Sequence, residues 1–144
     1  MKRILDVGCG NEPDRFFPGA ITAEANADID EIDYANFVSL EEPLPIPDGS
    51  FDLIWYSFGW HLTDDNDKAS IAAELSRVAA KRSTIIFRDY LVIQNWNTGS
   101  ERRISLATWK KRLMKYFKPL GWNTPELYRG GRHDVLCILP RNWG

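Results

Sequence analysis

Short apolar runs alternate along the chain with two stretches in which apolar residues have helical spacing. Runs of three to six mostly apolar residues, most of them bounded by glycine, proline or acidic residues, predict buried strands. We interpret as strands residues 4–7, 20–23, 36–38, 51–56, 83–87, 125–128 and 134–139. The last two flank Gly130 and Gly131, and this spacing predicts a hairpin that adds an antiparallel strand.

The helical stretches lie in the second half of the chain. The first is predicted to begin at the polar residues 64–66 and to end with Lys81 and Arg82, charges that suit the two ends of a helix dipole. The second covers residues 105–117 and stops before Pro119. Its apolar stripe consists of Leu106, Trp109, Leu113 and Phe117. The order of strands and helices predicts an α/β fold with a mostly parallel sheet.

Length and composition narrow the class of protein. The chain has 144 residues, 44% of them apolar and 26% charged, which fits one globular domain rather than a disordered or coiled-coil chain. No apolar run is long enough to span a membrane. Cys9 and Cys137 cannot form a disulfide framework or an all-cysteine zinc site. We therefore expect a soluble cytoplasmic protein without a metal site and without a membrane partner.

The charge is divided unevenly between the two halves of the chain. Residues 1–72 contain 4 Lys and Arg against 15 Asp and Glu, whereas residues 73–144 contain 14 against 5. Such asymmetry is compatible with ligands of opposite sign bound at different places. It is equally compatible with two halves that pair with each other or face solvent, and both explanations stay open.

The first strand leads into a glycine-containing loop that suits a nucleoside. Gly8 and Gly10, around Cys9, let a ligand approach the backbone closely, and Glu24 at the end of the next strand can accept hydrogen bonds from a ribose. A dinucleotide fingerprint needs a third glycine where Pro13 stands. A nucleoside without phosphates is therefore favoured over a nicotinamide dinucleotide.

Four segments together resemble the class I S-adenosylmethionine-dependent methyltransferases, and closest is the subgroup with the short-loop pattern GCG, PGA, LPxPDGSFD. They are ILDVGCG, PGAITAE, LEEPLPIPDGSFDLIWYSFGWHL and AAELSRVAAKRSTIIF. The resemblance implies a Rossmann-like three-layer sandwich whose strands, numbered in chain order, lie in the order 3-2-1-4-5-7-6. It also implies one domain over residues 1–144 that lacks the usual N-terminal helix, and S-adenosylmethionine as the cofactor.

The resemblance assigns roles to individual residues. The residues expected to bind the cofactor are Asp6, Gly8, Cys9, Gly10, Glu24, Ser39, Leu40, Tyr56 and Ser57. His61 is the expected catalytic base and Tyr56 a hydroxyl that positions the acceptor, with Asp89 in reserve. A loop histidine bound to backbone remains the alternative for His61. Glu12 and Ser39 replace a glycine and an aspartate of the family pattern, which keeps open a non-catalytic relative that binds the cofactor or a partner without turnover.

A basic stretch follows in the second half. Residues 101–118 contain seven basic side chains and one acidic one, and Trp96, Trp109 and Trp122 lie in and around them. Single-stranded nucleic acid or a phosphorylated ligand would use such a combination of charge and stacking, whereas a solvated helix face is the alternative. We expect a methyltransferase that acts on a small or phosphate-bearing acceptor. Nucleic acid is less favoured, and a homodimer could cover the cofactor crevice.

Overall fold

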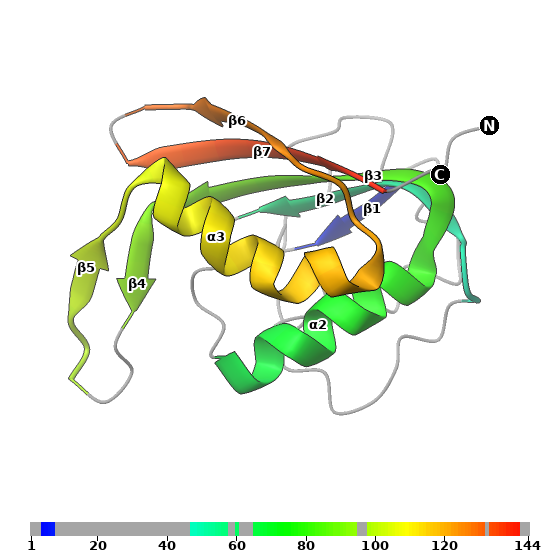
Figure 1. The fold of residues 1–144 in the computed structure, drawn as a ribbon, viewed down its shortest axis with the longest axis horizontal. Coiled ribbons are helices and arrows are strands. Elements are labelled where there is room, and N and C mark those ends of the chain that lie inside the picture. The colour runs from blue at the N-terminus through cyan, green and yellow to red at the C-terminus, as the bar shows by residue number, and fades with distance from the viewer. Residues whose placement is uncertain are drawn as a thin grey trace.

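The structure is a computed structural model, and it describes residues 4–7, 47–57, 60, 65–94, 98–131 and 133–141. Within these ranges lie seven strands, two α-helices and one 3-10 helix, drawn in Figure 1. The strands are β1 (Ile4–Val7), β2 (Phe51–Ser57), β3 (Ala79–Tyr90), β4 (Val92–Gln94), β5 (Glu101–Arg103), β6 (Glu126–Arg129) and β7 (Asp134–Pro140). The helices are α2 (Asp65–Val78), α3 (Leu106–Phe117) and the 3-10 helix η3 (Lys118–Leu120).

Five of these strands form one mixed sheet in the order β1-β2-β3-β7-β6. Strands β1, β2 and β3 run parallel, whereas β7 runs antiparallel to β3 and to β6. This confirms an α/β fold with a closing antiparallel hairpin. The strands predicted at residues 20–23 and 36–38 lie outside the described residues. The described strands occur in the relative order 1-4-5-7-6 of the predicted sheet, and the complete order stays a prediction.

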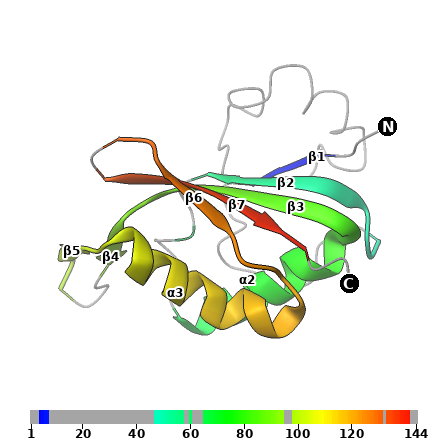
Figure 2. The same cartoon turned by 45° about the horizontal axis from the view of Figure 1, so that its top comes forward.

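Helices α2 and α3 cover the same face of this sheet, as Figure 2 shows. The described residues therefore provide two layers of the predicted sandwich. Between the layers lies an aromatic core, which consists of Trp60, Phe87, Trp109, Phe117 and Trp122. Neighbouring rings in it lie 5.6 to 6.0 Å apart between centroids, mostly edge to face, the geometry that aromatic pairs prefer.

The second predicted helix is confirmed to within one residue. Ser105 caps α3, since its Oγ accepts a hydrogen bond from the backbone N–H of Thr108 at 3.1 Å. Pro119 lies in the 3-10 turn that follows, and Gly121 adopts a left-handed conformation with φ of 88°. The buried side of α3 carries Trp109, Leu113 and Phe117, three members of the predicted stripe.

The predicted end of the first helix is wrong. Helix α2 ends at Val78 and β3 begins at Ala79, so Lys81 and Arg82 are exposed strand residues rather than the last turn of a helix. Contacts from distant segments fix this boundary: Ala79 pairs with Phe51, and the guanidinium of Arg141 donates to the carbonyl of Ala79. These tertiary contacts outweigh the local preference of basic residues for a helix C-terminus.

Strands β4 and β5 form a separate two-stranded sheet that the sequence pattern did not predict. All three residues of β5 are exposed, so no alternation of apolar and polar residues marks it. Between β3 and β4 lies the buried Leu91, whose N–H donates to the carbonyl of His133 and whose carbonyl accepts from the N–H of Ile104. Within the described ranges, neither helix is long and apolar enough to cross a membrane.

Candidate functional site

The carboxyl ends of β1, β2 and β3 form the edge of the sheet where ligands of parallel α/β folds bind. The strands are in close register here: Val7 lies beside Tyr56, and Tyr56 lies beside Phe87. Asp6 pairs with Trp55. We call this part of the molecule the carboxyl edge, and it brings together three of the predicted site residues, namely Asp6, Tyr56 and Ser57.

The other predicted site residues lie outside the described residues. They are Gly8, Cys9, Gly10, Glu24, Ser39, Leu40 and His61, and their roles stay predictions. Near His61 in the sequence, two residues are described. Trp60 is buried against Phe87 and Phe117, and Asp65 begins α2.

Tyr56 is a core residue as well as a predicted site residue. Its side chain is only 1% exposed, and its ring lies 5.6 Å from that of Phe87 between centroids. Since paired residues of neighbouring strands share a face, Tyr56 lies on the side of the sheet that α2 and α3 cover. Packing in the core explains why an aromatic ring stands at this position. That the hydroxyl of Tyr56 positions an acceptor stays a prediction.

Asp89, the reserve base, is fully buried near the end of β3. One of its carboxylate oxygens accepts a hydrogen bond from the indole N–H of Trp109 on α3 at 3.0 Å. A buried carboxylate is costly unless it has such a donor. The contact therefore attaches α3 to the carboxyl edge, and it gives Asp89 a structural task in the described protein.

A second carboxylate, Asp65, joins α2 to α3. Its Oδ1 lies 3.8 Å from Nζ of Lys68 and 3.8 Å from Nη2 of Arg112, and it accepts a hydrogen bond from the hydroxyl of Tyr116 at 3.3 Å. Desolvation of Tyr116 raises the pKa of its hydroxyl, and the charge of Asp65 raises that pKa further. Figure 1 shows the start of α2 on the same side of the molecule as the arrowheads of β1 and β2, so this cluster flanks the carboxyl edge.

Sequence reasoning missed this cluster because its members are far apart along the chain. Asp65 and Tyr116 are separated by 51 positions, and only the packing of α2 against α3 brings them together. The acidic residue was predicted to favour the start of a helix, which it does. No local pattern connects it to the basic residues of the following helix.

The tryptophans of the basic stretch have a different role from the one that the pattern suggested. Trp109 and Trp122 are each 3% exposed and lie in the aromatic core, so their rings offer no stacking surface. Trp96 lies outside the described residues. Among those that are described, no group of three or more His, Cys, Asp or Glu side chains is arranged to hold a metal ion.

Comparison with known proteins matches part of the sequence to a family model and the fold to solved structures. Residues 17–87, which are 71 of the 144 residues, match a family model described as a methyltransferase domain. An S-adenosylmethionine-dependent methyltransferase from Aquifex aeolicus superposes with a TM-score of 0.58 at 15% identity, covering 97% of this chain and 82% of that one. A methyltransferase from Methanosarcina mazei gives a TM-score of 0.57 at 14% identity, with 99% and 93% covered.

The chain has the class I methyltransferase fold. The fold that the sequence resemblance implied is thus supported, and part of the chain matches a methyltransferase domain, whereas the short-loop subgroup stays a prediction. The same matches, together with a solved complex of DhpI with S-adenosylhomocysteine, support S-adenosylmethionine as the cofactor.

A curated relative of this methyltransferase-fold chain acts on a hydroquinone. The 2-methyl-6-phytyl-1,4-hydroquinone methyltransferase of Synechocystis sp. is 37% identical over 73 residues. The alignment covers 50% of this chain and 20% of that protein, so the match spans about a fifth of the relative's length.

Proposed function

We propose that the protein transfers a methyl group from S-adenosylmethionine to a small acceptor. The observation that carries the proposal is the carboxyl edge, at which β1, β2 and β3 end in parallel in a chain that matches a methyltransferase domain. The matched region begins before β2 and ends within β3, so it includes all of β2 and most of β3.

The strand ends fit the cofactor that the family implies. Val7 and Tyr56 lie side by side in the register, and Gly8 and Gly10 follow Val7 directly in the chain. A strand end followed by glycines lets the backbone approach the ligand closely. We propose that this loop holds the methionine part of the cofactor and that Glu24 binds the ribose hydroxyls. Ser39 and Leu40 would lie beside the adenine.

When bound, the cofactor supplies a methyl group that its sulfonium has already activated. The protein then has to orient the acceptor and, where the nucleophile carries a proton, to remove it. We propose His61 as the residue that takes this proton and Tyr56 as a hydroxyl that orients the acceptor. The acceptor that we propose is small and either phosphate-bearing or, like that of the Synechocystis relative, a hydroquinone.

Calorimetric titration with S-adenosylmethionine and with S-adenosylhomocysteine tests the cofactor. We expect binding in the micromolar range, and we expect Gly8→Val to abolish it because a branched side chain would occupy the approach to the backbone. Gly131→Val is the matched control, since a Cβ at this exposed glycine meets only ordinary contacts. An absence of heat with both ligands would refute the cofactor assignment while leaving the fold intact.

A transfer assay with a radiolabelled methyl group then separates an enzyme from a non-catalytic relative. The acceptor panel contains small phosphorylated compounds and short-chain hydroquinones. We expect His61→Ala to lower the transfer rate by about 10²- to 10⁴-fold, the range of general base catalysis, and His133→Ala to leave the rate unchanged. Cofactor binding without transfer to any acceptor would favour the non-catalytic relative, in which Glu12 and Ser39 have replaced family residues.

We also propose that the protein is located in the cytoplasm and that it forms a homodimer. A second copy could cover the cofactor crevice, and sedimentation velocity with and without S-adenosylmethionine tests this arrangement. A monomer that binds the cofactor with full affinity would contradict it.

A further inference from the structure

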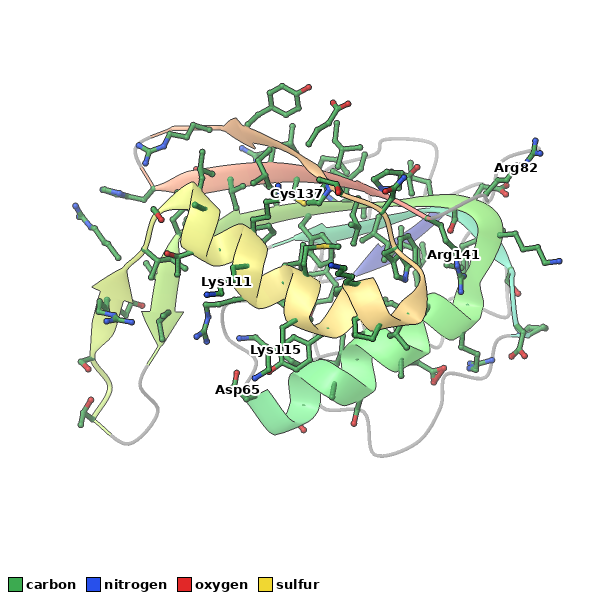
Figure 3. All side chains as sticks on the ribbon, in the orientation of Figure 1. Asp65, Arg82, Lys111, Lys115, Cys137 and Arg141 are labelled. Carbon is green, nitrogen blue, oxygen red and sulfur yellow. The ribbon has the colours of Figure 1, made fainter. Side chains whose placement is uncertain are left out.

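The outer face of α3 carries a row of lysines. Lys111 and Lys115 lie on α3, and Lys118 directly follows it as the first residue of η3. They are spaced by four and three residues, so they lie along one side, and all three are exposed. This side is opposite to the buried Trp109 and Phe117. Figure 3 labels two members of the row on α3. We propose that this lysine face binds the surface of an anionic lipid bilayer, a function that goes beyond methyl transfer.

The lysine face has no carboxylate on its own segment. Residues 102–125 contain no Asp or Glu, and Arg102 and Arg103 on the exposed β5 extend the basic stretch toward the start of α3. Two carboxylates approach α3 from the elements packed against it. Asp65 contacts Arg112 and Tyr116, and Asp89 is buried under Trp109. Neither of them contacts the three lysines of the outer face.

A lipid surface fits this face better than nucleic acid does. Single-stranded nucleic acid is bound through stacking on exposed aromatic rings as well as through charge, and Trp109 and Trp122 are buried in the aromatic core. The two exposed tyrosines of the described residues, Tyr90 and Tyr128, lie on β3 and β6 rather than on α3. A row of ammonium groups needs only a planar array of phosphates. Leu120, two residues beyond Lys118, is 38% exposed and provides an apolar side chain at the end of the row, as interfacial helices do.

The sequence predicts no membrane partner because no apolar run is long enough to span a bilayer. Binding to the surface of a bilayer does not require such a run. The chain as a whole has a net charge of −2, so the bulk charge would repel it from anionic lipid. Attraction therefore depends on the local face and on the orientation that the uneven charge of the two halves imposes. The interaction is expected to weaken steeply as salt shortens the Debye length.

Vesicle co-sedimentation of the full chain tests the proposal. We expect binding to vesicles of phosphatidylglycerol and phosphatidylcholine in equal parts and none to vesicles of phosphatidylcholine alone. The double variant Lys111→Gln/Lys115→Gln should lose about 25-fold in affinity, because each basic residue near an anionic surface contributes about fivefold. The charge-reversed variant Lys111→Glu/Lys115→Glu should not bind detectably.

The matched control removes the same charge elsewhere. Lys81 and Arg82 are exposed residues near the start of β3, and Figure 3 shows Arg82 at the opposite end of the molecule from Lys111. We expect Lys81→Gln/Arg82→Gln to change vesicle affinity by less than about twofold, since these residues would lie farther from the lipid than a Debye length. Circular dichroism verifies that each variant remains folded.

Three results would overturn the proposal. They are equal binding to neutral and anionic vesicles, equal loss in the two glutamine variants, and a single-stranded oligonucleotide that displaces the protein from vesicles at the same salt concentration. The last result would assign the face to nucleic acid. Cofactor titration of the same variants should be unchanged, so failure of vesicle binding is distinguishable from failure of the proposed methyl transfer.

Discussion

Both ends of the α3 region are attached to the rest of the protein by buried indole groups, but the acceptors differ in charge. At the carboxyl edge, Trp109 donates to the carboxylate of Asp89 at 3.0 Å. At the opposite end, Trp122 donates to the hydroxyl of Ser76 at 2.8 Å. Both tryptophans are 3% exposed, so burial is equal and only the chemistry of the partner differs.

The opposite end is organised around the last turn of α2. Ser76 donates to the carbonyl of Ala72, and Nη1 of Arg141 donates to the carbonyls of Ser76 and Ala79 at 2.7 Å each. The guanidinium also lies over the ring of Trp122, with 5.2 Å between its Cζ and the ring centroid. A cation that binds the final carbonyls of a helix stabilises it through hydrogen bonds and through the helix dipole.

The two ends differ in the kind of group that each of them buries. The end near Arg141 satisfies backbone carbonyls and a hydroxyl, which are groups with no role in proton transfer. The carboxyl edge buries an ionisable group, which is more costly, at the place where ligands of this fold bind. The hydrogen bond from Trp109 offsets part of this cost.

Replacing Trp109 with alanine should have the largest effect on this comparison. The substitution leaves a cavity in the aromatic core and removes the N–H donor of Asp89, so the free energy of unfolding should fall by about 3–5 kcal/mol. Urea denaturation measures the loss. Thr108→Ala, at an exposed neighbour on α3, is the control, and a loss no larger than that of the control would show that α3 is not held through Trp109.

Loss of the Arg141 guanidinium should have the next largest effect. Arg141→Met keeps the aliphatic stem but removes two hydrogen bonds at the junction of α2 and β3, and it should lower the free energy of unfolding by about 2–3 kcal/mol. Arg129→Met on the exposed edge strand β6 is the matched control, with an expected change below about 0.5 kcal/mol. Thermal denaturation compares the two variants, and equal shifts in Tm would contradict the capping role.

A titration at Cys137 probes the core between the two ends. Burial raises the pKa of this thiol from 9.0 to about 12, although the charge of Lys110 acts in the other direction. The unfolded chain loses the proton near pH 9 and the folded chain retains it, so the free energy of unfolding falls as the pH rises from about 9 to 12. The slope approaches ~1.4 kcal/mol per pH unit, or about 2 kcal/mol by about pH 10.5.

The variant Cys137→Ala isolates this titration. Its free energy of unfolding, measured in urea between about pH 8 and 10.5, should fall less steeply than that of the parent protein. Identical slopes would mean that the thiol is accessible to ionisation in the folded state. Alkylation followed by mass spectrometry provides an independent check, because a buried protonated thiol reacts slowly.

The smallest expected effect is also the most direct test of the difference between the two indoles. Trp109→Phe and Trp122→Phe each remove one N–H donor and keep an aromatic ring in place. Hydrogen bonds to charged groups contribute more than neutral ones, so the first variant should lose about 1 kcal/mol more than the second. Equal losses in urea denaturation would remove the distinction between the two ends.

Those parts of the fold that depend on local pattern could be predicted from the sequence. The limits of α3 follow from its apolar stripe, from Ser105 and from Pro119, all within or next to the helix. The hairpin of β6 and β7 follows from Gly130 and Gly131 between two short strands. In these segments the residues that determine the structure are neighbours in the chain.

Features that depend on distant contacts could not be predicted in the same way. The end of α2 is set by contacts with Arg141, which is 62 positions from Ala79. The pairing of Trp109 with Asp89 likewise requires α3 to fold back onto β3. From the sequence, Trp109 could belong either to the apolar stripe or to a surface for stacking. The packing of α3 against the sheet shows that it belongs to the core.

The capped junction between α2 and β3 also has a consequence for the order of events during synthesis. The N–H of Gly49 donates to the carbonyl of Arg77. Arg141, which directly follows β7, donates to the carbonyls of Ser76 and Ala79. While β7 is still inside the ribosome, the carbonyls of Ser76 and Ala79 lack the guanidinium of Arg141. A nascent chain arrested before residue 141 should therefore expose this junction to proteases, and release of the last strand should protect it.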